Sequence, residues 1–135
     1  MQTSGNASSP DSLPRVSRPW GWFETLAEGL DYRVKRLLIQ PRMRLSLQRH
    51  RHRCEHWVVV AGSGLLHLEG QDIPAEPGTT LFIPVRALHR ASAGAEALVI
   101  VEVQRGEELR EDDIERLADD HGRADDHGLV LGDRI

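Results

Sequence analysis

Short runs of apolar and β-branched residues, separated by residues that favour turns, occupy most of the chain from residue 32 onward. Strands at this spacing are typical of an all-β sandwich or barrel. The runs that we interpret as strands are residues 32–40, 43–50, 57–61, 65–69, 79–83 and 98–103. Several turns between them contain Gly or Pro, which commonly end strands. The pattern therefore predicts an all-β domain.

The segment after the last predicted strand has a different pattern. Three acidic residues at 111–113 precede the apolar residues Ile114, Leu117 and Ala118. Acidic side chains stabilise the first turn of a helix because the helix dipole is positive there. We therefore predict a short C-terminal helix. The sequence Ala-Asp-Asp-His-Gly occurs at 118–122 and again at 124–128, which is too little for a repeat architecture.

The 135 residues fit one ordinary domain. Residues 1–17 are rich in Ser, Pro, Asn and Gly and show no apolar period, so we interpret them as a disordered or loosely attached N-terminal arm. Residues 18–123 form the predicted domain, and residues 124–135 form a C-terminal tail.

Charge and cysteine content narrow the class of protein. The formal net charge is −4, and no basic stripe follows the chain, so nucleic acid is not an expected partner. No apolar run reaches the roughly 18 residues of a membrane span, and the N-terminus has no signal-peptide pattern. Cys54 is the single cysteine, which excludes an internal disulfide and favours a reducing compartment. We expect a cytoplasmic protein that does not bind membranes.

Candidate chemistry begins on the predicted strand 43–50. Met43, Leu45 and Leu47 lie on one face of the alternation, and polar residues, ending in Gln48 and His50, lie on the other. His52 follows on the same parity, and histidines two apart on a strand can direct their nitrogens to one point. Such a face is either a solvent-exposed polar surface or a metal site.

Two longer motifs favour the metal site. The chain contains His-x-His-x2-Glu-x6-Gly from His50 to Gly62 and Gly-x5-Pro-x4-His from Gly78 to His89. This pair resembles the two cupin motifs, with one residue fewer than usual between the second His and the Glu. The resemblance implies a cupin double-stranded β-helix, or jelly-roll, barrel around one divalent ion. The ligands that it implies are His50, His52, Glu55 and His89, with Gln48 as a further ligand or a partner of the ligands. Zinc is the first expectation, and cobalt, manganese, iron and nickel also suit this ligand set.

A longer resemblance extends from Arg18 to Arg123. In order and approximate spacing, the chain is similar to the C-terminal cupin domain of type II mannose-6-phosphate isomerases, where this domain usually follows a GDP-mannose pyrophosphorylase domain. We expect it here as a stand-alone domain. The stretches that carry the similarity include Arg-Pro-Trp-Gly at 18–21, Leu-Ser-Leu-Gln at 45–48, Glu-His-Trp-Val-Val-Val at 55–60, Val-Glu-Val-Gln at 101–104 and Glu-Asp-Asp-Ile at 111–114.

This resemblance implies metal-dependent interconversion of mannose 6-phosphate and fructose 6-phosphate, which supplies GDP-mannose and polysaccharide synthesis. It makes Arg123 and Lys35 candidates for catalysis, and Arg18, Arg53 and Trp57 candidates for substrate binding. The alternative for each cation is a solvated surface charge, and the alternative for Trp57 is a place in the core. No residue is identified as the base. His56 is a weak candidate, since it points away from the face of Glu55.

Three departures from the family pattern leave other functions open. Arg42 and Arg86 stand where the family has Gly, which supplies either a positive φ or room in a turn; in the first case Arg strains the backbone. His121 replaces a family Tyr. The alternative functions are a dioxygenase-type cupin enzyme and a non-catalytic sugar- or metabolite-binding module. A homodimer is expected from the resemblance alone.

Overall fold

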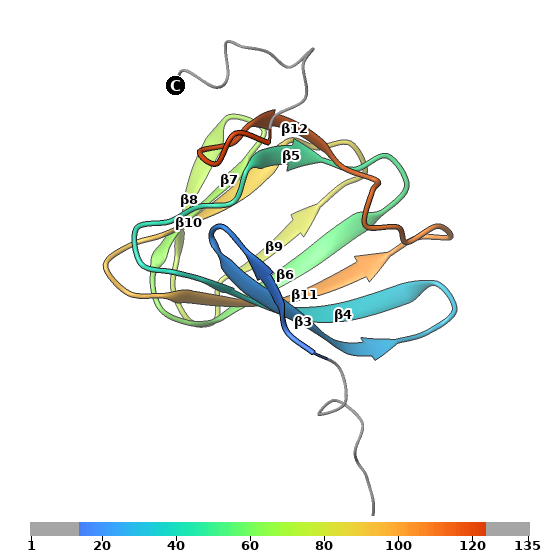
Figure 1. The fold of residues 1–135 in the computed structure, drawn as a ribbon, viewed down its shortest axis with the longest axis horizontal. Coiled ribbons are helices and arrows are strands. Elements are labelled where there is room, and N and C mark those ends of the chain that lie inside the picture. The colour runs from blue at the N-terminus through green and yellow to red at the C-terminus, as the bar shows by residue number, and fades with distance from the viewer. Residues whose placement is uncertain (1–13, 124–135) are drawn as a thin grey trace, which may run out of the picture.

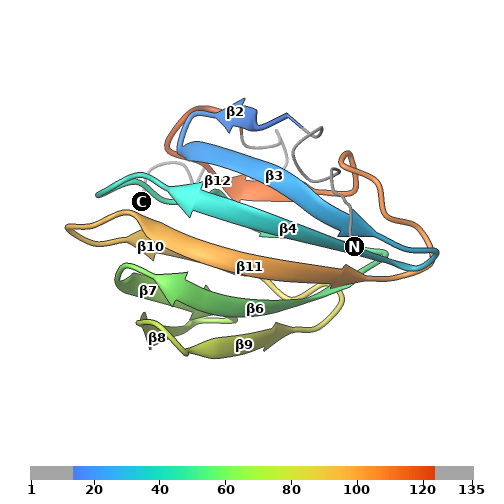
Figure 2. The same cartoon turned by 90° about the horizontal axis from the view of Figure 1, so that it is seen from below.

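The computed structural model describes residues 14–123, and this range consists of strands and loops without a helix. Two antiparallel sheets pack face to face (Figure 1). The six-stranded sheet has the order β2 (Val16–Arg18), β3 (Gly21–Glu28), β4 (Tyr32–Ile39), β11 (Leu98–Arg105), β6 (Cys54–Ala61) and β9 (Thr80–Ile83), which can be followed from edge to edge in Figure 2. The five-stranded sheet has the order β12 (Glu115–Ala118), β5 (Leu47–Arg49), β10 (His89–Ala93), β7 (Gly64–Leu68) and β8 (Gln71–Ala75). The predicted all-β fold is confirmed.

The space between the sheets is apolar at one end and polar at the other. Alternate residues of a strand point to the same face. Along β4, β6 and β11 the inward-facing residues change from apolar at one end to polar at the other. The apolar end contains Leu37 and Ile39 of β4, Trp57 and Val59 of β6, and Leu98 and Ile100 of β11. The same faces continue with Lys35, Glu55, Glu102 and Gln104, all buried. A polar end inside a two-sheet fold is the natural place for a site.

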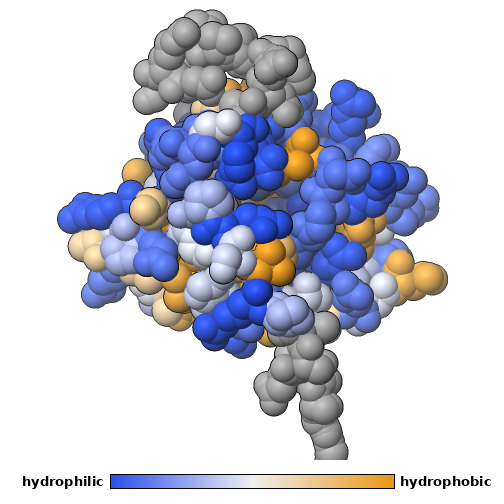
Figure 3. Space-filling view, viewed as in Figure 1, coloured by the Kyte–Doolittle hydropathy of each residue, from blue (hydrophilic) through white to orange (hydrophobic). Residues whose placement is uncertain are grey.

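The face seen in Figure 3 is mostly hydrophilic, with separate hydrophobic residues between the charged ones. The described residues contain no helix that is long and apolar enough to cross a membrane.

Most predicted strands are present, with two kinds of error. Strands β2, β3, β8 and β10 were not predicted. The predicted strand 43–50 is reduced to β5, preceded by one isolated bridge between Arg44 and Ser92. Its expected alternation also fails at the start, because Leu45 and Ser46 are both buried while Met43 is exposed.

The predicted C-terminal helix is wrong. Residues 115–118 form β12, which pairs with β5 at the edge of the five-stranded sheet. The acidic residues before it bind other segments instead of capping a helix. Glu111 bonds Lys35, and the Asp113 carboxylate accepts the backbone N–H groups of Arg51 and His52. Pairing with β5 satisfies an otherwise open sheet edge. Together with the long-range bonds, this pairing outweighs the weak local preference for helix.

The domain boundaries can be compared only in part. Residues 1–13 of the predicted arm lie outside the described residues. Its last two residues, Val16 and Ser17, belong to β2. The tail 124–135, with the second copy of the repeat, lies outside the described residues.

Arg42 and Arg86 both adopt the left-handed backbone conformation, with φ of 66° and 72°. A residue with a Cβ rarely adopts this region because of steric crowding, whereas Gly does so readily. Of the two alternatives, a positive φ and room in a turn, the positive φ therefore holds. Both arginines strain the backbone of their turns.

Candidate metal centre

Three side chains meet at the polar end of the interior. His50 follows β5, Glu55 lies on β6 and His89 opens β10, so both sheets contribute. The His50 Nε2 atom lies 3.1 Å from Glu55 Oε2, and His89 Nε2 lies 3.7 Å from Glu55 Oε1. One ligand atom from each residue falls within 4.8 Å of the others, and all three residues are buried. This spacing suits coordination of one ion.

Backbone carbonyl groups orient both imidazole rings. His50 Nδ1 lies 2.7 Å from the carbonyl oxygen of Asp113, and His89 Nδ1 lies 2.9 Å from that of Ala87. A carbonyl oxygen can only accept, so each Nδ1 carries a proton and donates it. In the neutral rings the lone pairs are therefore on Nε2, the atoms that face Glu55.

These residues fit a divalent metal. His89 Nε2 is buried and has no hydrogen-bond partner among the described residues, and a buried polar atom without a partner is costly unless something binds it. Two imidazole nitrogens and one carboxylate are ligands that zinc, iron, cobalt, manganese and nickel all accept. An ion held by these residues would supply Lewis-acid chemistry.

Charge and burial set the protonation of these groups. Burial lowers the pKa of His89 to about 4, against the attraction of Glu55, so this ring is neutral at physiological pH. Burial alone would raise the pKa of Glu55, but the contact with His50 and the charges of His50, His89 and Arg53 hold it well below its ordinary range. The site therefore presents a carboxylate and a neutral imidazole at neutral pH.

Arg53 contacts two of the three candidate ligands. It is buried; its Nε donates to Glu55 Oε2 at 2.8 Å, and its Nη2 lies 3.2 Å from His50 Nε2. Its Nη1 donates to the carbonyl oxygen of Arg110. Arg53 thus fixes the Glu55 carboxylate and the loop around residue 110 at the same time.

A second buried carboxylate is linked to the first through Trp57. The Trp57 indole N–H lies 3.0 Å from Glu55 Oε1 and 3.1 Å from Glu102 Oε1, and Gln104 donates to Glu102 Oε2 at 2.7 Å. Burial and the negative charge of Glu55 raise the pKa of Glu102 to about 7. The interior therefore contains one firmly ionised carboxylate and one that titrates near neutrality.

A cavity of about 110 Å³ opens beside these groups. Aromatic and apolar side chains form part of its wall, and its cationic lining residues are Arg18, Lys35, Arg53, Arg116 and Arg123. Lys35 is buried, bonds Glu111 and lies 4.1 Å from the centre of the Phe23 ring. Arg123 is held by the Asp119 carboxylate at 2.7 Å. Such a cavity suits an anionic ligand.

The structure brings some predicted site residues together and separates others. Arg18, Lys35, Arg53, Arg123 and Gln48 line the cavity with His50 and Glu55. Gln48 lies opposite His89 in the β5–β10 pairing and accepts a hydrogen bond from Ser46. His52 does not join the ligand group: its side chain is 53 % exposed and its Nδ1 lies 3.7 Å from Glu108.

The two remaining aromatic candidates lie in other places. Trp57 is buried in the core, 1 % exposed, and is absent from the cavity wall. His56 packs against Phe82, with 4.8 Å between the ring centres, on the parity opposite to Glu55.

Sequence reasoning did not identify three residues that shape the site. Asp113 orients His50 through its backbone and fixes the loop at 51–52 through its carboxylate. Glu111 holds Lys35, and Arg116 of β12 lines the cavity. All three belong to the segment that was interpreted as a helix. The stretch Glu-Asp-Asp-Ile, which carried part of the family resemblance, was the available signal.

Fold and site together define a cupin with a candidate metal centre. The described structure is similar to that of an RmlC-like cupin from Shewanella frigidimarina, with a TM-score of 0.68 and 17 % identity, covering 78 % of this chain and 92 % of that one. It is also similar to the capsular polysaccharide assembling protein CapF from Staphylococcus aureus, with a TM-score of 0.69 and 18 % identity, covering 79 % of this chain and 32 % of that one. These likenesses show the fold.

The sequence identifies the family. The family model described as mannose-6-phosphate isomerase C-terminal matches residues 6–119, and the chain belongs to this family. It is 41 % identical over 122 residues to the alginate biosynthesis protein AlgA of Pseudomonas aeruginosa, which covers 88 % of this chain and 25 % of the relative. It is 40 % identical over 109 residues to a mannose-1-phosphate guanylyltransferase of Escherichia coli, covering 80 % of this chain and 23 % of the relative. The chain thus spans about a quarter of the length of these curated relatives.

Proposed function

We propose that this protein is a metal-dependent sugar-phosphate isomerase that interconverts mannose 6-phosphate and fructose 6-phosphate. The observation that carries the proposal is the convergence of His50, Glu55 and His89 beside a cavity lined by cations. Membership of the mannose-6-phosphate isomerase C-terminal family supports it. The name of one relative, an alginate biosynthesis protein, supports a role in polysaccharide synthesis. Zinc is the first candidate for the ion.

The reaction moves a proton between the first two carbons of the open-chain sugar, through an enediol. A bound divalent ion would polarise the carbonyl and hydroxyl oxygens of those carbons. Arg18 and Arg123 offer the phosphate group charge-assisted hydrogen bonds from the cavity wall. Lys35 and Arg53 supply further positive charge where negative charge develops.

Glu102 is the candidate for proton transfer. It lines the cavity outside the ligand group, and Trp57 and Gln104 hold its two oxygens in place. A general base must be fixed within reach of the proton that it removes. Of the cavity carboxylates, Glu55 is engaged with Arg53 and Glu111 with Lys35.

A coupled assay of mannose 6-phosphate conversion, on protein reconstituted with zinc, cobalt or manganese, tests the proposal. We expect turnover that disappears with chelator and with His89→Ala. His67→Ala is the matched control and should leave turnover unchanged, because His67 of β7 contacts Asp72 of β8 outside the cavity. Folded, metal-loaded protein without turnover would exclude the isomerase.

One observation favours a second candidate. With His52 outside the group, the three converging ligands are two histidines and one carboxylate, a set also found in iron-dependent oxygenases. Oxygen consumption by iron-loaded protein, with no isomerase turnover, would favour a dioxygenase. Metal binding without either activity would favour a sugar- or metabolite-binding module.

A further inference from the structure

A second cationic hollow lies outside the barrel cavity. Three arginines, Arg49, Arg51 and Arg86, and one acid, Glu115, line a space of about 390 Å³. None of these four residues lines the barrel cavity. The hollow has a formal charge of +2 and is separate from the candidate metal centre.

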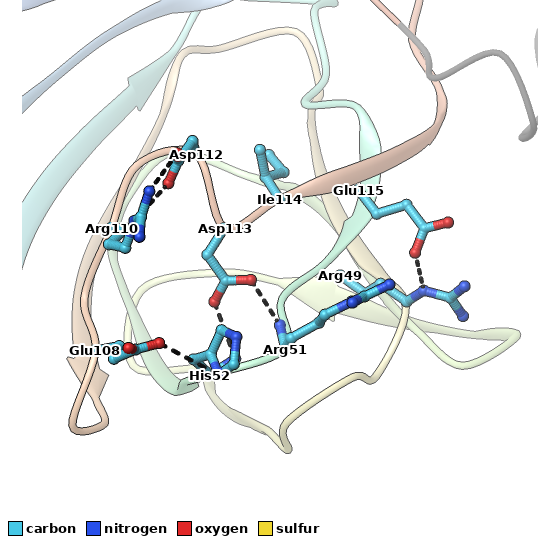
Figure 4. A pocket seen from close by; sticks show the side chains of 9 residues that line it. All are labelled: Arg49, Arg51, His52, Glu108, Arg110, Asp112, Asp113, Ile114 and Glu115. Carbon is cyan, nitrogen blue, oxygen red and sulfur yellow. Dashed lines mark hydrogen bonds and ion pairs between the residues drawn. The ribbon is translucent and has the colours of Figure 1, made fainter.

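Arg49, Arg51 and Glu115 also line a neighbouring hollow, which is drawn in Figure 4 and whose carboxylates are already engaged. Figure 4 shows Asp112 facing the Arg110 guanidinium, Asp113 accepting the N–H groups of Arg51 and His52, and Glu115 bonded to Arg49. Glu108 lies 3.7 Å from the ring of His52. Each acid in this view therefore has its own partner, and none is directed at the Arg51 guanidinium.

Arg51 and Arg86 are exposed, and neither guanidinium has a hydrogen bond or an ion pair with residues 14–123. In Figure 4 the side chains of Arg49 and Arg51 extend in the same direction, on the Glu115 side of the neighbouring hollow. Like charges that share a hollow repel one another unless an anion lies between them. Arginine presents several N–H donors in a plane, which suits a phosphate group.

The backbone at Arg86 gives an independent indication. Its φ of 72° is a conformation that costs a non-glycine residue free energy. Strained backbone of this kind is concentrated at functional sites, and here it places an arginine at the hollow. The Arg86 N–H donates to the carbonyl oxygen of His50 at 2.8 Å, so the strained turn is attached to the loop that carries the candidate ligand.

We infer that Arg49, Arg51 and Arg86 form a binding site for the phosphate group of a small phosphorylated metabolite. The site lies outside the proposed catalytic cavity and goes beyond the proposed function. Glu115 balances one of the three positive charges of the arginines. The two that remain match the two negative charges of a phosphate dianion. Because Arg86 is bonded to His50, an anion bound here contacts the same turn that supports the metal centre.

The test is a titration of the full-length ¹⁵N-labelled chain with sodium phosphate and, separately, with mannose 6-phosphate, followed by amide NMR at constant ionic strength. We expect saturable shifts at the amides of Arg49, Arg51 and Arg86 with at least one of these ligands. A lower dissociation constant for the sugar phosphate would identify a hexose phosphate as the ligand class, and equal constants would identify phosphate itself.

Two variants with a common control test the assignment. Arg86→Gly and Arg51→Gln should each weaken binding at this hollow at least about tenfold, which corresponds to the loss of one charge-assisted contact. Arg42→Gly is the control, since it also removes one positive charge and one strained φ but does not line the hollow. Equal weakening by Arg42→Gly, or no saturable shift at the three amides, would overturn the inference. Shifts confined to cavity residues such as Lys35 would do so too, while leaving the proposed function intact.

Discussion

Main-chain carbonyl groups orient the two histidines of the candidate metal centre. The carbonyl groups of Asp113 and Ala87 take the Nδ1 protons of His50 and His89, so that each Nε2 faces Glu55. A metal ion needs the lone pairs of these Nε2 atoms, since only a deprotonated imidazole nitrogen is a ligand.

The two histidines of the His-x-His motif should differ in their effect on metal binding. His50→Ala removes a buried ligand, so we expect the bound metal to fall to near zero per chain. His52→Ala removes a side chain that is 53 % exposed and lies outside the ligand group, so stoichiometric metal should remain. Metal content after gel filtration measures both. One metal per chain in His50→Ala, or loss in His52→Ala, would contradict this ligand set.

At the scale of elements, the segment between β11 and β12 holds the ligand loop in place. It crosses from the six-stranded sheet to the five-stranded sheet (Figure 1). On the way, Glu111 binds Lys35, the Arg110 carbonyl binds Arg53, and Asp113 binds the loop at 50–52 through three bonds. The segment thus lines the cavity, and it also holds Lys35, Arg53 and the loop at 50–52 in place.

We expect Asp113→Ala to weaken metal binding about tenfold, the lower range for residues that orient metal ligands. The variant leaves the N–H groups of Arg51 and His52 without their acceptor and loosens the loop that carries His50. Asp112→Ala is the matched control, since its exposed carboxylate binds Arg110 alone among the described residues. Calorimetric titration with zinc compares the two, and equal affinities would refute a role for the Asp113 carboxylate.

At the scale of the whole molecule, a polar network lies between two sheets that are otherwise joined by apolar contacts. Glu55 and Glu102 are both buried and share the indole N–H of Trp57. Burying two carboxylates close together has a free-energy cost when both are ionised. The pKa of Glu102, raised from 4.5 to about 7, expresses that cost.

The sign of the resulting pH effect follows from proton binding. Between about pH 4.5 and pH 7 the folded protein keeps the Glu102 proton that the unfolded chain releases, so wild-type stability falls as pH rises through this window. Glu102→Gln cannot ionise and should be free of this loss. In chelator-treated protein, we expect the variant to gain up to about 3 kcal/mol in unfolding free energy relative to wild type between about pH 5 and pH 8.

Urea unfolding at both pH values measures this difference. Glu96→Gln, at an exposed position, is the control and should show the pH dependence of the wild type. A parallel pH dependence in Glu102→Gln and wild type would show that Glu102 is ionised in the fold across the whole range.

Short-range patterns in the sequence determined the fold class and much of the candidate ligand set. The runs of apolar and β-branched residues in β4, β6 and β11 predict strands because such side chains pack well on a pleated, half-buried surface. The cupin-like spacing selected His50, Glu55 and His89, which the structure brings together. Lys35, which the family resemblance made a candidate, is also buried at the polar end of the interior. The homodimer and the identity of the metal stay predictions.

Only the tertiary structure decided what depends on contacts between distant segments. Residues 115–118 form a strand because β5 offers an edge to pair with, and no local pattern contains that information. His52 lies outside the ligand group because the chain leaves β5 after Arg49, so strand parity no longer applies to it. The partnership of Lys35 with Glu111 joins residues 76 positions apart. Local periodicity fixes which face a side chain takes within an element, whereas the packing of elements decides which side chains meet.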